Sequence, residues 1–407
     1  MTVSTGPVNS GRIRVLFLNT RSALGADVMV HLSLIQNLNP ELVEVYVATN
    51  ANSSDLAPTL QHLQAIPPDR LLVPDLGHEW QAAGQGLPVR VVNGVKNLSA
   101  IATLAQLRSF IRKNRIDIIH STDRPRDALF ATLLAKMTGC RNVIHVHNGW
   151  NEYFGKATRW GLANCSAVLA ISNFTRQSFA DAGIPAAKLR LVHNSVDSRR
   201  FDPASARPGS FRERLGLSAA TPLVGIVARI MLWKGHLELV EALAKVRESI
   251  PNVQLAMIGK EDLLAVDGSP AFGARLRDRI QELGLEKHVH WVGWFDDMPS
   301  AISDLDVLAM PSWEEPFGLA VVEAMAMEKP VVGFASGALP EIITSGVEGE
   351  LVPAKDVSAL AAGLTKLLQD ASLRTQMGKS GRRRVVSEFD PRRKADELTA
   401  VYRSVVG

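Results

Sequence analysis

The sequence predicts an α/β fold with two doubly wound parallel-sheet domains that face a central cleft. Short apolar runs alternate along the chain with stretches of helical spacing, which is typical of strands linked by helices. The runs are apolar on both faces, as strands covered on both sides are. They form two series, each about the size of one doubly wound domain. The length of 407 residues agrees with two or three domains.

The expected strands are the apolar runs themselves. In the first half they are Arg12–Asn19, Val43–Thr49, Asp117–Ser121, Arg141–His147, Ala167–Ser172 and Leu189–Asn194. In the second half they are Pro222–Arg229, Val253–Gly259, Val289–Gly293, Asp306–Pro311, Pro330–Ala335 and Gly349–Val352. Helical spacing between runs is clearest in Arg126–Met137 and His236–Ile250. Parallel sheets bind ligands at the carboxyl ends of their strands, so residues that follow a strand are the first candidates for a site.

The domain boundary is expected in the stretch Asp202–Ser218, which is rich in Pro, Ser and Gly. We therefore expect a first domain over residues 1–203 and a second over 204–390. The tail Pro391–Val406 has the spacing of a terminal helix, and residues 391–407 are expected to pack back on the first domain.

Composition excludes several classes of protein. Apolar residues make up 46% and charged residues 21%, which are ordinary globular values. No run of 18 apolar residues is present, so no membrane-spanning helix is predicted. The N-terminus lacks a signal-type apolar core, and the two cysteines are expected to be buried thiols in a reducing, cytoplasmic compartment. A net charge of +4 is too small to indicate a nucleic-acid partner.

The segment Pro311–Glu328 carries the clearest chemistry. A strand ends, a loop holds two acids, and Pro316-Phe317-Gly318 opens a helix. Within this apolar helix Glu323 is the only charged residue, and a buried carboxylate needs hydrogen-bond donors. Ligand hydroxyls would supply donors, and the helix N-terminus would attract a phosphate. The alternative is a structural glutamate that is paired with an arginine or caps the helix.

Two cations follow the first strand of the second domain. Arg229 ends that strand and Lys234 lies five residues later in a loop. Two fixed cations at a strand end suit a diphosphate, whose negative charge must be neutralised. A common Lys-Gly surface turn is the alternative interpretation.

Three features of the first domain are weaker candidates. Alternation along the strand places His145 and His147 on the same face, with His147 nearer its end, where it could contact a substrate or a proton. The pair could begin a metal site, but no nearby Asp/His set completes one. The simpler interpretation of His145 is a hydrogen-bonded histidine of the core. His120 ends its strand in a similar way. Gly25 follows the first strand and could allow close approach of a phosphate or sugar.

Taken together, these motifs resemble the retaining glycosyltransferases of the family 4 type (glycosyl transferases group 1), which have the GT-B fold of two Rossmann-like domains. Glu315 and Glu323 match the E-x7-E motif of that family, and Arg229 and Lys234 match its diphosphate-binding pair. Further resemblance lies in Ser172-Asn173, in His193–Asp197 with Phe201, and in Pro340-Glu341 with Gly349.

The resemblance also implies roles for residues. Glu315 would bind donor-sugar hydroxyls and Glu323 the ribose, while Arg229 and Lys234 would stabilise the diphosphate. The amides of Phe317, Gly318 and Leu319 would support the phosphate and sugar, Gly25 would approach the donor, and His147 would contact the sugar. Trp294 would lie near the nucleotide base, although a core tryptophan is an equal alternative.

The reaction implied is transfer of a hexose-type sugar, with retention and without a metal or cofactor, from a nucleoside diphosphate sugar, in first place a UDP-sugar. The acceptor would be a polysaccharide, a lipid-linked sugar or a small molecule. An epimerase or a phosphorylase on the same fold stays open, whereas the missing G-x-G-x-x-G disfavours a dehydrogenase.

A non-enzymatic polyanion-binding protein is the third interpretation. Basic clusters in Leu107–Arg126 and Arg382–Lys394 motivate it, and they would also allow peripheral contact with an anionic membrane at its inner face. Solvated helix faces explain both clusters well and are the interpretation that we favour. The sequence leaves the oligomeric state undetermined.

Overall fold

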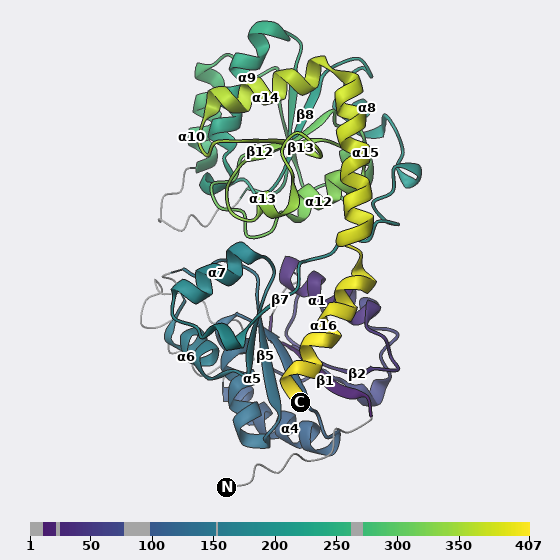
Figure 1. Ribbon diagram of the computed structural model, residues 1–407, viewed down its shortest axis with the longest axis vertical. Coiled ribbons are helices and arrows are strands. Elements are labelled where there is room, and N and C mark those ends of the chain that lie inside the picture. The colour runs from purple at the N-terminus through teal and green to yellow at the C-terminus, as the bar shows by residue number, and fades with distance from the viewer. Residues whose placement is uncertain (1–10, 22–24, 77–97, 152–153, 262–271) are drawn as a thin grey trace. The chain divides into compact units, whose positions relative to one another are not determined.

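The computed structural model describes residues 11–21, 25–76, 98–151, 154–261 and 272–407. The chain divides into two compact units, both coloured along the sequence in Figure 1. Unit 1 comprises Met1–His193 together with Pro391–Gly407, and unit 2 comprises Asn194–Asp390. The division falls after His193, whereas the composition placed it after residue 203, because the linker region already contacts unit 2.

Unit 1 contains a parallel sheet of seven described strands in the order β3-β2-β1-β4-β5-β6-β7. Their bounds are β1 Ile13–Asn19, β2 Val43–Thr49, β3 Leu71–Leu72, β4 Ile118–Thr122, β5 Arg141–Val146, β6 Ala167–Ala170 and β7 Leu189–Leu191. The order reverses between β1 and β4, which pair in parallel register from Val15 with Ile118 onward. Such a switch point is where doubly wound sheets bind ligands.

The described helices of unit 1 cover both faces of its sheet. They are α1 Ala26–Asn37, α2 Leu56–His62, α4 Leu98–Lys113, α5 Pro125–Thr138, α6 Lys156–Asn164, α7 Asn173–Asp181 and α16 Pro391–Val406. Leu16 and Leu18 of β1 pack in one core with α4 and α5, whereas Phe17 points to the other face, toward α1. Helix α16 lies beside α1 on that second face (Figure 1).

Unit 2 contains a parallel sheet of six described strands in the order β10-β9-β8-β11-β12-β13. Their bounds are β8 Leu223–Val227, β9 Gln254–Ile258, β10 Val289–Gly293, β11 Val307–Met310, β12 Val331–Phe334 and β13 Gly349–Val352. All but the outermost ones are largely buried runs of Val, Leu, Ile, Ala and Met, as expected of strands covered on both faces.

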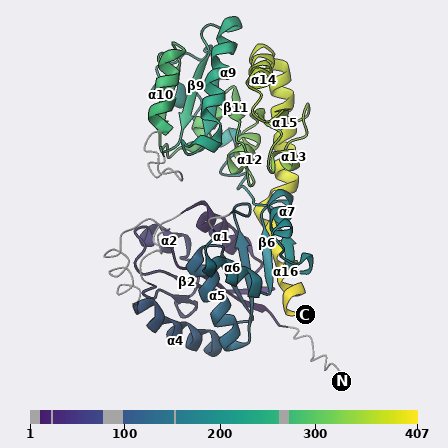
Figure 2. The same cartoon turned by 90° about the vertical axis from the view of Figure 1, so that its left-hand side faces the viewer.

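The described helices of unit 2 surround its sheet. They are α8 Ser210–Arg214, α9 His236–Ser249, α10 Phe272–Glu282, α11 Met298–Ser303, α12 Leu319–Ala326, α13 Leu339–Ile342, α14 Val357–Gln369 and α15 Ala371–Glu388. Helices α9 and α14 pack against each other and share one core with Val224 and Ile226 of β8 (Figure 2). Helix α12, which carries Glu323, packs on α15.

A buried carboxylate anchors the first segment of unit 2. Asp304 accepts hydrogen bonds from the amides of Gly209 (2.6 Å), Phe211 (2.8 Å) and Arg212 (3.1 Å), and so satisfies the N-terminus of α8. The Arg212 guanidinium donates to the Asp304 carbonyl at 2.8 Å and to Asp306 at 3.0 Å. This network ties the 209–212 segment to the start of β11.

The architecture of two parallel α/β sheets is as predicted. Strand bounds agree with the apolar runs to within a few residues, and the runs Val43–Thr49, Val289–Gly293 and Gly349–Val352 agree throughout. The two-residue strand β3 was missed because it is too short to form a pattern. Within the described residues, no helix is long and apolar enough to cross a membrane.

Candidate functional site

Lys234 and Glu315 form a buried ion pair at the carboxyl ends of β8 and β11. The Lys234 Nζ lies 2.7 Å from Glu315 Oε2, and the two side chains are 13% and 8% exposed. The strands are neighbours in the sheet, so the loops that follow them are brought side by side. A buried pair of this kind is held only with good geometry, because both charges have lost their water.

The backbone explains why these two loops approach so closely. The Trp313 amide donates to the Trp233 carbonyl at 2.9 Å, which links the loops directly. Gly235 has φ +75°, and a Cβ there would lie 1.9 Å from the Pro311 carbonyl oxygen. Only glycine allows this approach, so the Lys-Gly sequence is a structural requirement of the site.

A third loop holds the main chain of Glu315. The Ala338 amide, at the start of α13, donates to the Glu315 carbonyl at 2.8 Å. A Cβ on Gly337, whose φ is +59°, would lie 2.4 Å from the same oxygen. The loop after β12 thus fixes the main chain of Glu315, whereas Lys234 contacts its carboxylate. The sequence motif did not reveal this support.

Glu323 lies on α12 in apolar surroundings, as the sequence predicted. The helix begins after Gly318, which has φ +96°, and its neighbours Val322 and Ala324 are fully buried. Burial raises the pKa of the half-buried Glu323 carboxyl to about 7, and the charge of Arg200 offsets this only in part. Among the described residues no cation lies within ion-pair distance of this carboxylate, so the structural alternative of an arginine pair is wrong.

The remaining donor-side candidates lie around the same edge of the unit 2 sheet. Arg229 is exposed two residues after β8, and Phe317 is buried with its ring edge-on to Phe389. Leu319 is the first residue of α12, so the amides of the 317–319 stretch form its N-terminal turn. Trp294 follows β10 and is 64% exposed, which shows that the core-tryptophan alternative is wrong.

In unit 1 the structure places His147 directly after β5. Its amide donates to Asp123 at 3.4 Å, and burial lowers the pKa of its imidazole to about 4. His147 is therefore neutral at pH 7, and its Nε2 is buried without a hydrogen-bond partner in the described structure. A neutral imidazole of this kind can accept or donate one hydrogen bond to a substrate.

Gly25 caps the N-terminus of α1 in an extended conformation. A Cβ there would lie 2.1 Å from the Arg21 guanidinium, which forms an ion pair with Asp27. Arg124 also pairs with Asp27, at 3.3 Å, and although burial opposes it, these arginines lower the pKa of Asp27 to about 2. An arginine side chain occupies the space beside Gly25 that the sequence assigned to a phosphate or sugar.

Two groups in unit 1 were not found from the sequence. Asp127 is buried and accepts from the Thr20 amide at 2.9 Å and the Thr122 hydroxyl at 2.6 Å, which joins the ends of β1 and β4. The other group is a buried cluster of His31, His120 and His145. The cluster includes His145 of the H-x-H pair but not His147, and the partners of His145 come from distant parts of the chain, where a search of neighbouring residues does not find them.

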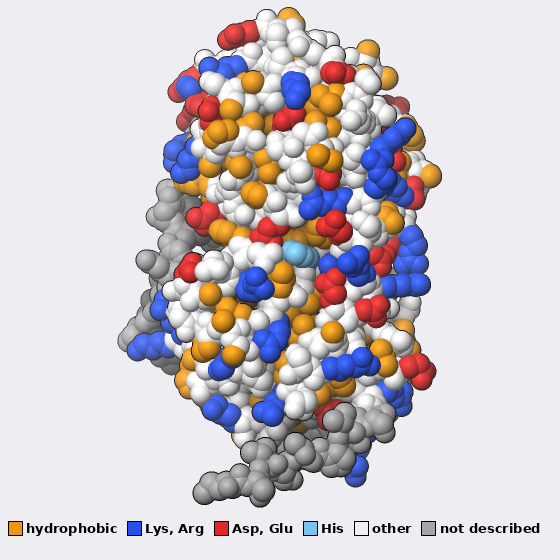
Figure 3. All heavy atoms as spheres, viewed as in Figure 1, with side chains coloured by type: hydrophobic (Ala, Val, Ile, Leu, Met, Phe, Trp, Pro, Cys, Tyr) orange, Lys and Arg blue, Asp and Glu red, His pale blue; other side chains and the backbone are white. Residues whose placement is uncertain are grey.

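The two basic clusters are largely used in internal contacts. Arg382 pairs with Asp202 at 2.7 Å, and Arg384 pairs with Glu348 at 3.4 Å. Arg126 is buried and donates to the Thr20 carbonyl. On the face shown in Figure 3, basic and acidic side chains are interspersed, which does not favour the polyanion-binding interpretation.

Comparison with known proteins agrees with this geometry. Residues 210–384 match the family described as Glycosyl transferases group 1, and residues 32–200 match Glycosyltransferase Family 4. The chain belongs to the family 4 glycosyltransferases. The range 210–384 lies in unit 2, the range 32–200 covers most of unit 1 and the first residues of unit 2, and the fold is GT-B.

Several members of the family are similar to this chain in sequence. A GDP-mannose-dependent phosphatidylinositol monomannoside mannosyltransferase of Mycolicibacterium smegmatis is 31% identical over 61% of this chain and 66% of its own length. A D-inositol 3-phosphate glycosyltransferase of Corynebacterium jeikeium is 33% identical, over 47% of this chain and 46% of its own length. The chain therefore aligns with less than two thirds of either protein. The mannosyltransferase LpsB of Rhizobium meliloti is 25% identical over 90% and 92%.

Solved structures show the same fold. HepE of Anabaena in complex with UDP has a TM-score of 0.77 at 21% identity, covering 96% of this family 4 chain and all of its own. Sucrose-phosphate synthase of Thermosynechococcus elongatus has a TM-score of 0.72 at 22% identity, covering 97% and 99%.

Proposed function

We propose that the protein transfers a hexose from a nucleoside diphosphate sugar to an acceptor hydroxyl with retention of the anomeric configuration. The observation that carries the proposal is the Lys234–Glu315 pair beside the N-terminus of α12, with Glu323 further along the same helix. A fixed cation, a helix N-terminus and two carboxylates are the groups that a diphosphate flanked by two polyols requires.

Each group has a defined task in this proposal. Lys234 and Arg229 bind the diphosphate, while Glu315 and Glu323 accept hydrogen bonds from the sugar and the ribose, respectively. Because Glu323 has its pKa raised to about 7 by burial, part of its population is protonated in the free protein at neutral pH. Ribose hydroxyls would stabilise the ionised form by donating to it.

The chemical step breaks the bond between the anomeric carbon and the β-phosphate oxygen. The electron pair of that bond stays on the departing nucleoside diphosphate, whose new charge Lys234 and Arg229 stabilise without a metal. The acceptor oxygen forms its bond on the face that the leaving group vacates, and its proton goes to a β-phosphate oxygen. His147 contacts the sugar as a neutral hydrogen-bonding group rather than as an acid.

The names of similar proteins and the ligands of solved structures suggest candidates for the nucleotide base of the donor and for the acceptor. Several similar proteins carry GDP-mannose in their names and HepE was solved with UDP, so a GDP-sugar is a candidate donor beside the UDP-sugar that we expected first. Lipid-linked acceptors are included because one relative acts on a phosphatidylinositol mannoside. Contact with an anionic membrane is an associated hypothesis, which co-sedimentation with anionic vesicles at low salt would test.

The test begins with thermal shifts of the purified chain in UDP-, GDP- and ADP-hexoses, because a ligand that binds only the folded state raises Tm. The donor that raises Tm is then incubated with polysaccharide, lipid-linked and small-molecule acceptors. Acceptor-dependent release of nucleoside diphosphate, with an α-linked product from an α-linked donor, supports the proposal. Conversion of the donor without an acceptor would indicate an epimerase, and turnover only with inorganic phosphate would indicate a phosphorylase.

A further inference from the structure

Three histidines from distant parts of the chain meet inside unit 1. His31 comes from α1, His120 from β4 and His145 from β5, and their exposed fractions are 4%, 0% and 1%. One potential ligand atom of each lies within 4.8 Å of the others. The cluster lies on the sheet face that α1 and α16 cover, and the ring of His147, which we assign to the sugar, lies against it with its centroid 4.4 Å from that of His145.

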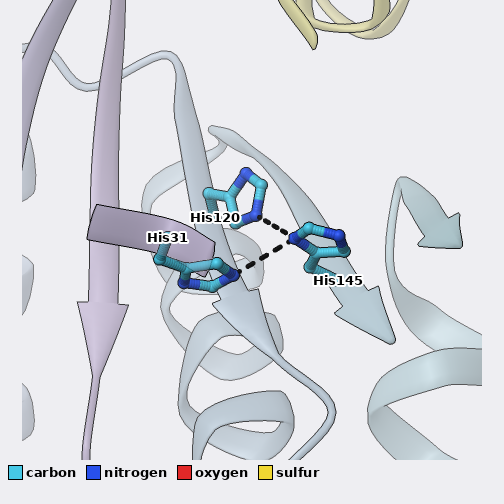
Figure 4. Close-up of side chains that lie close together, drawn as sticks. All are labelled: His31, His120 and His145. Atoms are coloured by element: carbon cyan, nitrogen blue, oxygen red, sulfur yellow. Dashed lines mark hydrogen bonds between the residues drawn. The ribbon is translucent and has the colours of Figure 1, made fainter. Parts of the chain in front are cut away.

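The ring nitrogens of these histidines point toward one another (Figure 4). His145 Nδ1 lies 3.3 Å from His120 Nε2 and 3.2 Å from His31 Nε2. Nitrogens bound to zinc at about 2.0–2.1 Å in a tetrahedron are separated by about 3.3 Å. These two separations match the edges of such a coordination shell, and the third pair of ligand atoms, from His31 and His120, lies within 4.8 Å.

Hydrogen bonding alone cannot satisfy this arrangement. A neutral imidazole nitrogen has either one N–H or one lone pair in the ring plane. His145 Nδ1 can therefore complete a hydrogen bond with His120 or with His31, but not with both. The buried nitrogen that is left without a partner costs about 1–3 kcal/mol, whereas one cation would engage all three lone pairs.

The surroundings orient the rings as they would for metal ligands. The Tyr402 hydroxyl lies 2.6 Å from His120 Nδ1, so its oxygen can accept a hydrogen bond from an N–H there, which leaves the lone pair on Nε2. Phe17 stacks on the His120 ring with centroids 4.7 Å apart and an interplanar angle of 22°.

We propose that His31, His120 and His145 form a binding site for one divalent transition-metal ion, with zinc as the expected occupant. Three imidazole donors suit Zn²⁺, Co²⁺, Ni²⁺ or Cu²⁺ and disfavour Mg²⁺ and Ca²⁺, which prefer oxygen ligands. The ion would tie α1 to β4 and β5 and would thus stabilise unit 1. This proposal is independent of the donor chemistry assigned to unit 2.

One feature limits the expected affinity. With Nδ1 on the metal, His145 carries its proton on Nε2, which has no hydrogen-bond acceptor among the described residues. The unsupported proton should make binding weaker than at a site whose ligands are all oriented by partners.

The experiment uses the full chain stripped of metal with a chelator and dialysed. Zn²⁺ is titrated by calorimetry, and the metal content after gel filtration is measured by mass spectrometry. We expect one ion per chain and a rise in Tm on loading, and Co²⁺ should give the visible absorption bands of cobalt bound to imidazole nitrogens. Mg²⁺ should produce neither effect.

Three variants assign the binding to the cluster. His31→Gln removes a ligand and should abolish the stoichiometric binding, whereas His62→Gln, at an exposed position of the same unit, should leave it unchanged. Tyr402→Phe keeps the ring and removes only the hydroxyl, so it should weaken binding roughly 10- to 100-fold even if His31→Gln does not fold. Absence of saturable 1:1 binding by the wild-type chain, or binding that Tyr402→Phe and His31→Gln both retain, would overturn the proposal.

Discussion

The ammonium of Lys234 and the carboxylate of Glu315 lie 2.7 Å apart, on loops that follow two neighbouring strands of unit 2. Each group is almost completely buried and depends on the other for its partner. Donor binding must therefore act on a pair that is already neutral, with the lysine oriented before the diphosphate arrives. This relationship leads to the first prediction.

Replacement of Lys234 with methionine should damage the protein in two separable ways. The buried Glu315 carboxylate loses its partner, which should lower the free energy of unfolding by about 3 kcal/mol. Transfer should fall about 100-fold or more, because the diphosphate loses a fixed cation. Urea denaturation and initial-rate assays measure the two effects.

The double variant Lys234→Met/Glu315→Gln separates stability from function. Because neither charge then remains unpaired, stability should return most of the way to that of the wild type while transfer stays low. Recovery of transfer in the double variant would show that Lys234 only neutralises Glu315 and has no part in binding the donor.

Gly337→Ala should displace Glu315 without touching its side chain. A Cβ at this position would lie 2.4 Å from the Glu315 carbonyl and 2.5 Å from its amide nitrogen, so the loop after β12 must move. Gly346→Ala is the matched control: its φ is also positive, at +84°, but nothing lies within 4 Å of the added carbon. Both variants should lose roughly 1 kcal/mol from the backbone conformation.

Transfer activity distinguishes the two glycine variants. Gly337→Ala should lower kcat/KM at least tenfold more than Gly346→Ala does. Equal activity in the two variants would mean that the position of the Glu315 main chain is unimportant for the reaction.

Glu323→Gln should stabilise the free protein at alkaline pH while weakening donor binding. The folded state raises the pKa of this carboxyl from 4.5 to about 7, so it binds more protons than the unfolded state in that interval. Stability of the wild type is therefore lost as pH rises from about 4.5 to about 7 and changes no further above it. The gain in Tm of the variant should be small at pH 5 and largest near pH 8.

The exposed neighbour Glu314 provides the control for this pH series. Glu314→Gln removes a carboxylate from the same segment at an exposed position, so it should leave the donor-induced rise in Tm unchanged. In the same samples, the donor-induced rise in Tm should shrink for Glu323→Gln only. A Tm gain for Glu323→Gln that does not vary between pH 5 and pH 8 contradicts the assigned burial effect.

Trp294→Ala should reduce nucleotide affinity about tenfold and leave stability nearly unchanged, because the side chain is 64% exposed. Calorimetric titration with the nucleoside diphosphate measures the affinity, and a melting curve measures the stability. A large loss of Tm with normal nucleotide binding would assign Trp294 to the fold instead of the site.

Asp304→Ala should destabilise unit 2 strongly. Three amides at the start of α8 lose their acceptor, which should lower the free energy of unfolding by about 3 kcal/mol. Arg207→Ala removes a 74% exposed partner of Asp297 and should cost less than about 1 kcal/mol. Similar midpoints in urea for both variants would show that the Asp304 network contributes little.

Much of the fold was predictable because buried parallel strands form continuous apolar runs. The same pattern identified Glu323, since a lone charge in an apolar helix stands out from its neighbours. The contact between Lys234 and Glu315 was not predictable, because it depends on the left-handed conformations of Gly235 and Gly337 in separate loops. Sequence spacing carries no information on how loops from different strands approach each other.

The histidine cluster shows the same limit over a greater distance. His31 lies 114 positions before His145, and its helix is largely apolar and buried. Alternation along the strand placed His145 and His147 on the same face of the sheet, but it did not show which helix covers that face. Partners of buried polar groups become visible only when the packing of helices on sheets is known.

Helix α16 has a consequence for how the chain is made. It supplies Tyr402 to unit 1, although it follows all of unit 2 in the chain. During synthesis on the ribosome, the whole of unit 2 emerges before the segment that covers this face of the first sheet. The first unit therefore cannot be completed before α16 has emerged, and the sheet face that α16 covers lacks this helix until then.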